Sequence, residues 1–276
     1  MTAVSCKRAA SVSLVALLLF TGCSLLRDLD ELEPGPGAAD AATSTRDAPV
    51  PRGTCPDAMV ERRFDDVTRF CIDRFETTMG EYKAFLDQDA GMLPAERCAG
   101  NLSLDPAEPG QNCSSATFDP VRFKTLPVVC VDQCDAQTYC RARGARLCGG
   151  KGGATLLKRE RNTPSADEWF LACSGGSRPF SGGPEATGCV FSPDAGRTAP
   201  EPAASVGCTT PEGVEHLSGN VGEWTNDCER PETDCVIRGG NLGDATPAAL
   251  RCDAEDLKRP ASFRSPVIGF RCCSDL

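Results

Sequence analysis

The residues best suited to chemistry lie between His216 and Trp224, where the sequence reads His-Leu-Ser-Gly-Asn-Val-Gly-Glu-Trp. The two glycines permit backbone dihedrals that other residues avoid, and Asn220 tolerates a left-handed turn. Glu223 offers carboxylate oxygens to a hard cation, with neighbouring carbonyls as further ligands. The segment Arg238–Gly240 adds two more glycines. The pattern fits a structural turn anchored by the tryptophan, a calcium-binding loop, or a loop that contacts a substrate.

The composition indicates an exported protein that depends on disulfides. The 276-residue chain contains 18 cysteines, which is unusual in the cytosol and indicates an oxidising compartment. Metal-thiolate clusters are the alternative, but the scattered spacing of the cysteines disfavours them. Aromatic residues make up only 6% of the chain, so large side chains are scarce in its core. The formal net charge of −10 argues against a nucleic-acid partner and against a basic face for membrane docking.

The N-terminus has the features of an export signal. Two basic residues precede a mostly apolar stretch, Ser11–Phe20, which is short for a membrane-spanning helix. The Gly22–Cys23 pair resembles the end of a bacterial lipoprotein signal, in which this bond is cut and the cysteine is acylated. The resemblance implies a signal peptide over residues 1–22 and a lipid anchor on Cys23. Ser24 points, by the same resemblance, to the outer membrane. An ordinary secretory signal is the alternative.

The remaining chain divides into a tether and a folded domain. Residues 23–54 are expected to be the lipidated cysteine and a flexible tether, because they are rich in proline, glycine, alanine and polar residues. The domain is expected over residues 55–276. Once Cys6 leaves with the signal peptide and Cys23 takes the lipid, sixteen cysteines remain, enough for eight disulfides. Their full connectivity does not follow from the sequence.

Local patterns predict short helices and strands joined by long loops. The expected helix caps are Thr77 before Met79–Leu86, Asp132 before Cys134–Arg143, and Ser165 at the start of a helix through Trp169. The segments expected to be extended are Phe70–Asp73, Leu126–Val131, Val236–Arg238 and Val267–Cys272. Two loops are expected to be closed by local disulfides, Cys98 with Cys113 and Cys189 with Cys208.

Seven segments resemble, in this order, the formylglycine-generating enzyme family, also called sulfatase-modifying factor domains. They are Cys71–Thr77, Pro127–Val129 with Asp135–Cys140, Gly144–Leu147, Pro164–Trp169, Ser218–Trp224, Arg238–Gly240 and Gly269–Arg271. The resemblance covers about residues 55–276 and implies a disulfide-rich α+β fold of C-type-lectin-like topology, with little regular secondary structure. Its structural positions include Asn220, Trp224, Arg238, Gly239, Gly240 and Arg271.

The resemblance also indicates which chemistry is missing. Active members oxidise a cysteine of a sulfatase to formylglycine with a copper-binding cysteine pair, placed between the Arg-Gly-Gly segment and the next Arg-Cys. Here that interval, Asn241–Arg251, contains no cysteine, whereas copper(I) needs soft thiolate ligands. A related branch uses iron held by several histidines, but His216 is the only histidine in this chain. We therefore expect no catalytic residues and no certain cofactor.

A structural calcium ion is the one cofactor that the resemblance leaves open. Carried over from active relatives, its ligands are the side chains of His216 and Glu223 and the carbonyls of Gly219 and Val221. His216 is a poor ligand for a hard cation, so we expect weak calcium binding or none. This histidine is expected to be a satisfied turn residue, with a pH-sensitive contact as the alternative.

The resemblance also pairs some cysteines. It implies the disulfides Cys140–Cys272 and Cys173–Cys252, and Cys55 and Cys71 are assigned to disulfides as well. The adjacent Cys272 and Cys273 are expected to bond to separate partners, with a vicinal disulfide as the alternative.

These expectations combine into one interpretation of function. The chain is expected to be a cell-envelope lipoprotein whose domain has kept the family framework and lost the copper chemistry. It would bind or scaffold an unknown protein or glycan ligand, with the membrane as a partner through its lipid. A formylglycine-generating oxidoreductase acting on sulfatases is the alternative.

Overall fold

The computed structural model describes residues 53–88, 98, 101, 103–106, 113, 118–192, 200–205, 207–230, 234–254 and 257–276. All of them belong to one compact unit, Pro49–Leu276. The predicted signal peptide, the lipidation site Cys23 and nearly all of the predicted tether lie outside the described residues. Within the described residues, no helix has the length and hydropathy needed to cross a membrane.

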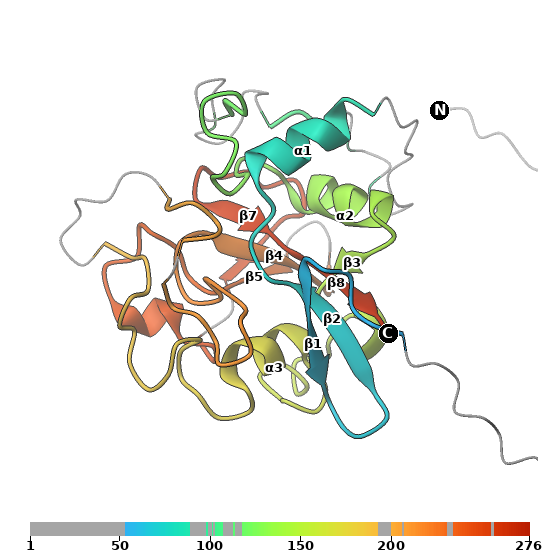
Figure 1. Ribbon diagram of the computed structural model, residues 1–276, viewed down its shortest axis with the longest axis vertical. Coiled ribbons are helices and arrows are strands. Elements are labelled where there is room, and N and C mark those ends of the chain that lie inside the picture. The colour runs from blue at the N-terminus through green and yellow to red at the C-terminus, as the bar shows by residue number, and fades with distance from the viewer. Residues whose placement is uncertain are drawn as a thin grey trace, which may run out of the picture. The chain divides into compact units, whose positions relative to one another are not determined.

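In the described part of the chain, two four-stranded sheets form the frame (Figure 1). The first is antiparallel, with the order β1 (Met59–Arg63), β2 (Arg69–Asp73), β8 (Cys272–Asp275) and β3 (Arg146–Leu147). The second has the order β6 (Leu257–Arg259), β5 (Cys235–Arg238), β4 (Gly222–Cys228) and β7 (Ile268–Phe270), in which only β4 and β7 run parallel. The pairing of β2 with β8 joins the two ends of the domain.

Three α-helices and two 3₁₀ helices of the described chain pack on this frame. They are α1 (Met79–Leu86), α2 (Gln133–Ala142), α3 (Glu168–Ser174), η3 (Lys151–Gly153) and η4 (Pro247–Leu250). Figure 1 shows α1 and α2 on one side of the sheets and α3 on the other. This short-element α+β architecture is the fold class that the sequence predicts.

The helix caps agree with the sequence prediction at one position and differ at two. Asp132 caps α2 as expected, in a complete capping box. The cap of α1 is Thr78 and not Thr77, because the glutamate three residues after Thr78 completes the reciprocal bonds of a capping box. The cap of α3 is Asp167 and not Ser165, because the Asp167 carboxylate accepts the hydrogen bond that the first turn offers.

One of the extended segments needs a correction. Phe70–Asp73 and Val236–Arg238 lie in β2 and β5 as expected. Val267–Cys272, however, does not form one strand, because the chain leaves β7 and enters β8 of the other sheet at Arg271. Leu126–Val131 forms no regular strand; Pro127 makes a single bridge with Thr78, and the Val128 amide donates to the Thr77 carbonyl at 2.8 Å.

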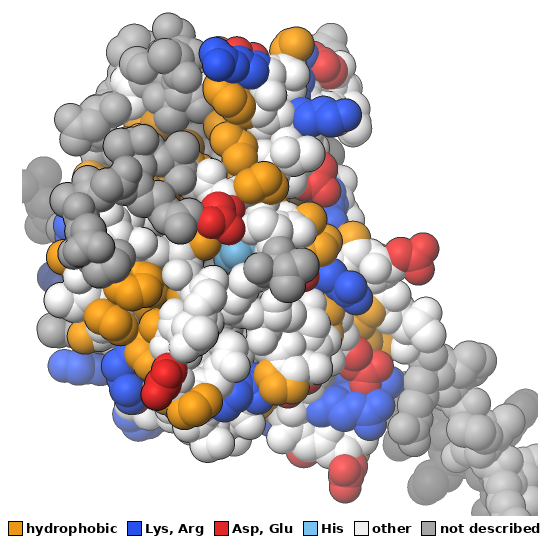
Figure 2. Space-filling view, turned by 60° about the vertical axis from the view of Figure 1, so that its left-hand side comes forward, with side chains coloured by type: hydrophobic (Ala, Val, Ile, Leu, Met, Phe, Trp, Pro, Cys, Tyr) orange, Lys and Arg blue, Asp and Glu red, His pale blue; other side chains and the backbone are white. Residues whose placement is uncertain are grey.

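Two hydrophobic clusters form the core. One joins α1 and α2 to β4 and β7, with Tyr82, Tyr139 and Phe270 in mutual ring contact. The other gathers around α3 and includes Trp169. On the face shown in Figure 2, acidic and basic side chains are interspersed among hydrophobic and uncharged ones.

All sixteen cysteines from Cys55 to Cys273 form disulfides with one another. The pairs are Cys55–Cys71, Cys98–Cys134, Cys113–Cys130, Cys140–Cys272, Cys148–Cys273, Cys173–Cys252, Cys189–Cys208 and Cys228–Cys235. Both pairs implied by the family resemblance are bonded, and the adjacent Cys272 and Cys273 have separate partners. The expected Cys98–Cys113 disulfide is wrong. Cys98 bonds to Cys134 in the first turn of α2, and Cys113 bonds to Cys130 just before this helix.

Candidate functional site

The carboxylate of Glu223, near the end of the predicted turn and at the start of β4 (Gly222–Cys228), accepts hydrogen bonds from protein donors at both oxygens. Its Oε1 accepts from Arg271 Nε at 2.8 Å, and its Oε2 accepts from Trp169 Nε1 at 2.8 Å. The Arg271 guanidinium also donates to backbone carbonyls of neighbouring loops. Glu223 and Arg271 are each 1% exposed. The carboxylate therefore holds α3, β4 and the junction between β7 and β8 together.

Asn220 has a left-handed conformation, which asparagine tolerates, with φ of 59°. Its Nδ2 donates to Glu76 Oε2 at 2.9 Å, and its Oδ1 accepts from the Glu201 amide at 2.9 Å. The preceding Gly219 has φ of 90°, and a Cβ there would lie 2.3 Å from the Val190 carbonyl oxygen. Glycine is required at this position, and the turn packs tightly against its neighbours.

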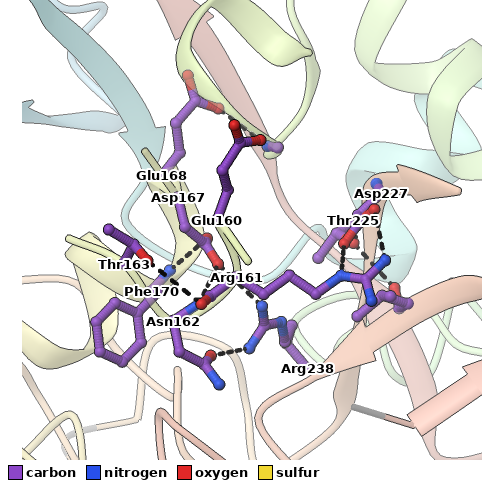
Figure 3. Close-up of polar contacts among 12 residues, drawn as sticks. Glu160, Arg161, Asn162, Thr163, Asp167, Glu168, Phe170, Thr225, Asp227 and Arg238 are labelled. Atoms are coloured by element: carbon purple, nitrogen blue, oxygen red, sulfur yellow. Dashed lines mark hydrogen bonds and ion pairs between the residues drawn. The ribbon is translucent and has the colours of Figure 1, made fainter. Parts of the chain in front are cut away.

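Arg238 is fixed by the start of α3, as Figure 3 shows. Its Nη1 donates to Asn162 Oδ1 at 2.5 Å and its Nη2 to Asp167 Oδ2 at 2.9 Å. Asp167 is also the cap of α3, so one carboxylate connects this helix to β5. A second buried ion pair, between Arg161 and Asp227, lies beside the first in the same view. These pairs fasten Asp227 of β4 and Arg238 of β5 to the segment that leads into α3.

A pocket of about 430 Å³ lies where β5 ends at Arg238 and is followed by Gly239 and Gly240. Its lining residues come from β4, β5, the η4 loop and β6: Gly222, Ile237, Arg238, Gly239, Gly240, Asn241, Asp244, Ala248, Ala249, Arg251, Cys252, Ala254 and Leu257. Mostly aliphatic residues and glycines form it, and Asn241, Asp244 and Arg251 add polar groups. The volume is in the range of sites that take a small ligand or a partner side chain.

Comparison with known proteins identifies the family. The model of the sulfatase-modifying factor enzyme 1-like domain matches residues 43–276. The chain belongs to this family. Two solved structures have a similar fold: PvdO from Pseudomonas aeruginosa, at 22% identity and a TM-score of 0.50 over 79% of this chain and 90% of PvdO, and CarF, at 20% identity and a TM-score of 0.50 over 76% of this chain and 87% of CarF. No curated protein sequence matches the chain.

The residues of this sulfatase-modifying factor domain do not fit the copper ion of its active relatives. The interval Asn241–Arg251 lines the pocket, yet it brings carboxylate, amide and guanidinium groups and no sulfur. The neighbouring Cys252 is bonded to Cys173. Since every cysteine from Cys55 onward is in a disulfide, none of them offers a thiolate, the ligand that copper(I) prefers.

The predicted calcium ligands do not fit the ion either. The Arg271 guanidinium lies against the Glu223 carboxylate, so a cation at that position would meet a like charge. His216, the other predicted side chain, turns to Ser205, whose carbonyl and hydroxyl oxygens both lie 3.0 Å from its Nε2. Among the described residues, no group of three or more His, Cys, Asp or Glu side chains is arranged to hold a metal.

His216 is a buried turn residue with φ of 57°. Burial, together with the charge of Arg271, lowers its pKa to about 4. Its Nδ1 is buried without a hydrogen-bond partner. The expectation of a fully satisfied turn histidine therefore holds for Nε2 only.

Sequence reasoning missed several residues of the polar network. Glu76 and Asp167 lie within segments that carry the family resemblance, but neither was assigned a role in the site. The signal in each case was an acidic residue beside apolar ones in a predicted core segment. Asn162 had no such signal, because it comes from a loop with no periodic pattern and reaches Arg238 only in the folded chain.

Proposed function

We propose that this chain is a non-catalytic binding module of the sulfatase-modifying factor family, held at the cell envelope by a lipid on Cys23. One observation carries the proposal. All sixteen cysteines of the domain are committed to disulfides, while the pocket beside Arg238–Gly240 is open. The framework that would present a substrate is present, and the thiolates that would activate oxygen are not.

The lining of the pocket favours a polypeptide ligand over a glycan. No aromatic ring is among the described residues that line it, so it lacks the flat apolar surface on which a sugar ring stacks. Ile237 and Leu257 instead provide aliphatic contact, and Asn241 and Asp244 provide a side-chain amide and a carboxylate nearby. This combination suits an apolar side chain with its adjoining peptide group, because a peptide group both donates and accepts hydrogen bonds.

The proposed absence of catalysis is tested directly. The full chain is incubated with copper(I), oxygen and a peptide that carries a sulfatase-type cysteine, and the aldehyde is sought by mass spectrometry. We expect no aldehyde above a control without protein, while an active formylglycine-generating enzyme converts the same peptide. Aldehyde formed by the chain would refute the proposal and favour the oxidoreductase.

The proposed binding is tested with a variant that fills the pocket. Ala248→Trp places a large ring in the lining, and Ala245→Trp is a matched control in the same loop outside it. Both positions are exposed, so neither substitution disturbs the core. The full chain is screened against a phage-displayed library of linear peptides and an array of envelope glycans. We expect peptides that bind the wild type and Ala245→Trp but not Ala248→Trp; glycans alone showing this pattern would contradict the polypeptide assignment.

The proposed anchor has its own test. Cys23→Ser should move the protein from the membrane fraction to the soluble fraction of the envelope, because the acyl chains provide the attachment. Metabolic labelling with a palmitate analogue should mark the wild type and not the variant. An unlabelled wild type would indicate an ordinary secretory signal.

A further inference from the structure

A second pocket, of about 120 Å³, shares no lining residue with the pocket beside Arg238–Gly240. It is formed by the connection between β2 and α1, the end of α2 and the loop around Ala203. The lining residues are Ala58, Asp73, Phe75, Glu76, Thr77, Thr78, Glu81, Thr125, Arg143, Ala203 and Ala204. It has room for a few water molecules or for a small polar head group.

Glu76, in the lining of this pocket, differs from the other buried carboxyl groups. Eight carboxyl side chains are buried among the described residues: Asp73, Glu76, Asp132, Asp135, Asp167, Glu168, Glu223 and Asp227. Seven of them form ion pairs with an arginine. Glu76, which is 1% exposed, has no ion pair and accepts only from the Asn220 amide group and the Val221 N–H. A buried carboxylate is ordinarily paired with a cation, because its desolvation is costly.

The charged neighbours of Glu76 do not supply that cation. Arg271 is the nearest cationic influence on it, but its donors go to Glu223 and to backbone carbonyls. Arg143 lines the pocket and forms two hydrogen bonds with Asp73, so its charge is compensated. Glu81 adds a further negative charge at the pocket. The charge balance of the pocket therefore favours a cation.

A second, independent observation comes from Thr77. Thr77 is 2% exposed and lines the same pocket. Its hydroxyl oxygen is buried and has no hydrogen-bond partner. An unpartnered buried hydroxyl costs free energy. A ligand that donates hydrogen bonds would satisfy it, together with the carboxyl group of the adjacent residue.

We propose that this pocket binds a primary ammonium group, which forms the ion pair that Glu76 lacks and donates to the Thr77 hydroxyl. A metal ion fits less well, because the described residues contain no group of three metal-ligating side chains. The ammonium is provided either by a small free amine or by a lysine side chain of a polypeptide. The same contacts serve both.

Binding should release a proton. Burial, with the nearby charge of Glu223, raises the pKa of Glu76 to about 8, so the empty pocket holds this group mainly as the neutral acid at pH 7. When the ammonium binds, Glu76 ionises to form the ion pair and its proton passes to the buffer. The number of protons released therefore distinguishes this site from a weak surface contact.

The test uses calorimetry on the full chain at pH 7, in phosphate and in MOPS, two buffers of different ionisation enthalpy. The ligands are n-butylammonium, for the free amine, and Nα-acetyl-lysine N-methylamide, for the polypeptide lysine. Saturable binding of either, with close to one proton released, supports the proposal and identifies the source. Tetramethylammonium, which has no N–H donor, should not bind. Failure of both primary amines to bind would overturn the proposal.

Two variants test the site itself. Glu76→Gln should weaken amine binding at least tenfold and abolish the proton release, while Glu185→Gln, at an exposed position, should change neither. Because Glu76→Gln alters buried hydrogen bonds, Thr77→Val provides a second test. It removes a hydroxyl that has no protein partner, so the melting temperature should be kept while amine affinity falls about fivefold. Thr246→Val, exposed and outside the pocket, is its control; unchanged affinity in both pocket variants would exclude this site.

Discussion

Arg271 and Glu223 form a buried ion pair, with Arg271 Nη2 2.6 Å from Glu223 Oε1 and each residue 1% exposed. It joins the point where the chain passes from β7 to β8 with the start of β4. The pair thus links β4 of one sheet to the residue that leads into β8 of the other.

Breaking this pair should be strongly destabilising. In Arg271→Met, the Glu223 carboxylate stays buried with the Trp169 indole as its main donor, and we expect a loss of about 3–5 kcal/mol in the free energy of unfolding. The double variant Glu223→Gln with Arg271→Met should lose less than the sum of the two single variants. Urea denaturation measures all of them. Arg251→Met removes an exposed ion pair with Asp253 and should stay within about 1 kcal/mol of the wild type.

Calcium should have no effect on stability. The Glu223 oxygens are already occupied by Arg271 and Trp169, and an ion there would have to displace both donors. Melting temperatures measured with excess calcium and with a chelator should therefore coincide. A chelator-sensitive transition would contradict this prediction and show that the folded chain binds calcium.

The stability should fall as the pH rises from mildly acidic to neutral values. The pKa of Glu76 is raised from 4.5 to about 8, chiefly by burial, so the folded state binds this proton more tightly than the unfolded state. The corresponding stabilisation is complete below pH 4.5 and is lost as the pH rises towards 8. Asp135, with its pKa raised to about 7 by burial, acts in the same direction. Glu76→Gln should therefore reduce this slope, measured by urea denaturation across the range, without abolishing it.

His216 should give the opposite dependence at lower pH. Its pKa is lowered from 6.5 to about 4, first by burial, so the unfolded state binds the proton more tightly. The stabilisation from the neutral ring is present above pH 6.5 and is lost as the pH falls towards 4. His216→Gln should remove this component, since no other histidine is present. If the free energy of unfolding of the variant and the wild type depended on pH in the same way between pH 4 and 6.5, this role of His216 would be wrong.

The Cys173–Cys252 disulfide, next to the larger pocket, should stabilise the domain without deciding how the other cysteines pair. Cys173 lies in α3 and Cys252 lines the pocket, 79 residues further along the chain. Replacing both by alanine should lower the free energy of unfolding by about 2–4 kcal/mol, mainly because the unfolded chain gains freedom. Chemical denaturation under oxidising conditions provides the measurement. Peptide mapping without reduction should recover the other seven pairs unchanged.

Much of the local structure could be read from short patterns. Asp132 caps α2 because an acidic side chain three residues before another can satisfy two backbone amides within one turn. Asn220 adopts a left-handed conformation between two glycines for an equally local reason. The misplaced caps of α1 and α3 differ from the prediction by one and two positions, since a neighbouring side chain offered a better bond.

Disulfides and ion pairs between residues far apart in the sequence could not be predicted as well. The expected Cys98–Cys113 pair relied on proximity in sequence, whereas Cys98 bonds to Cys134 in α2 and Cys113 bonds to Cys130 just before it. The possible calcium ligands, expected to bind weakly if at all, were carried over from the family resemblance. That resemblance did not anticipate that Arg271, 48 residues from Glu223, would occupy the carboxylate.

The amino-acid order determined the family, the short-element α+β fold, the number of disulfides available and the absence of cysteine in Asn241–Arg251. These properties depend on residue identity and on spacing within one turn or one loop. Only the tertiary structure decided which cysteines bond and which arginine pairs with each of seven buried carboxyl groups. It also showed that Glu76 is the only buried carboxyl group among the described residues without an ion pair. Partners of that kind are brought together by packing in three dimensions, and no sequence interval encodes the distance between them.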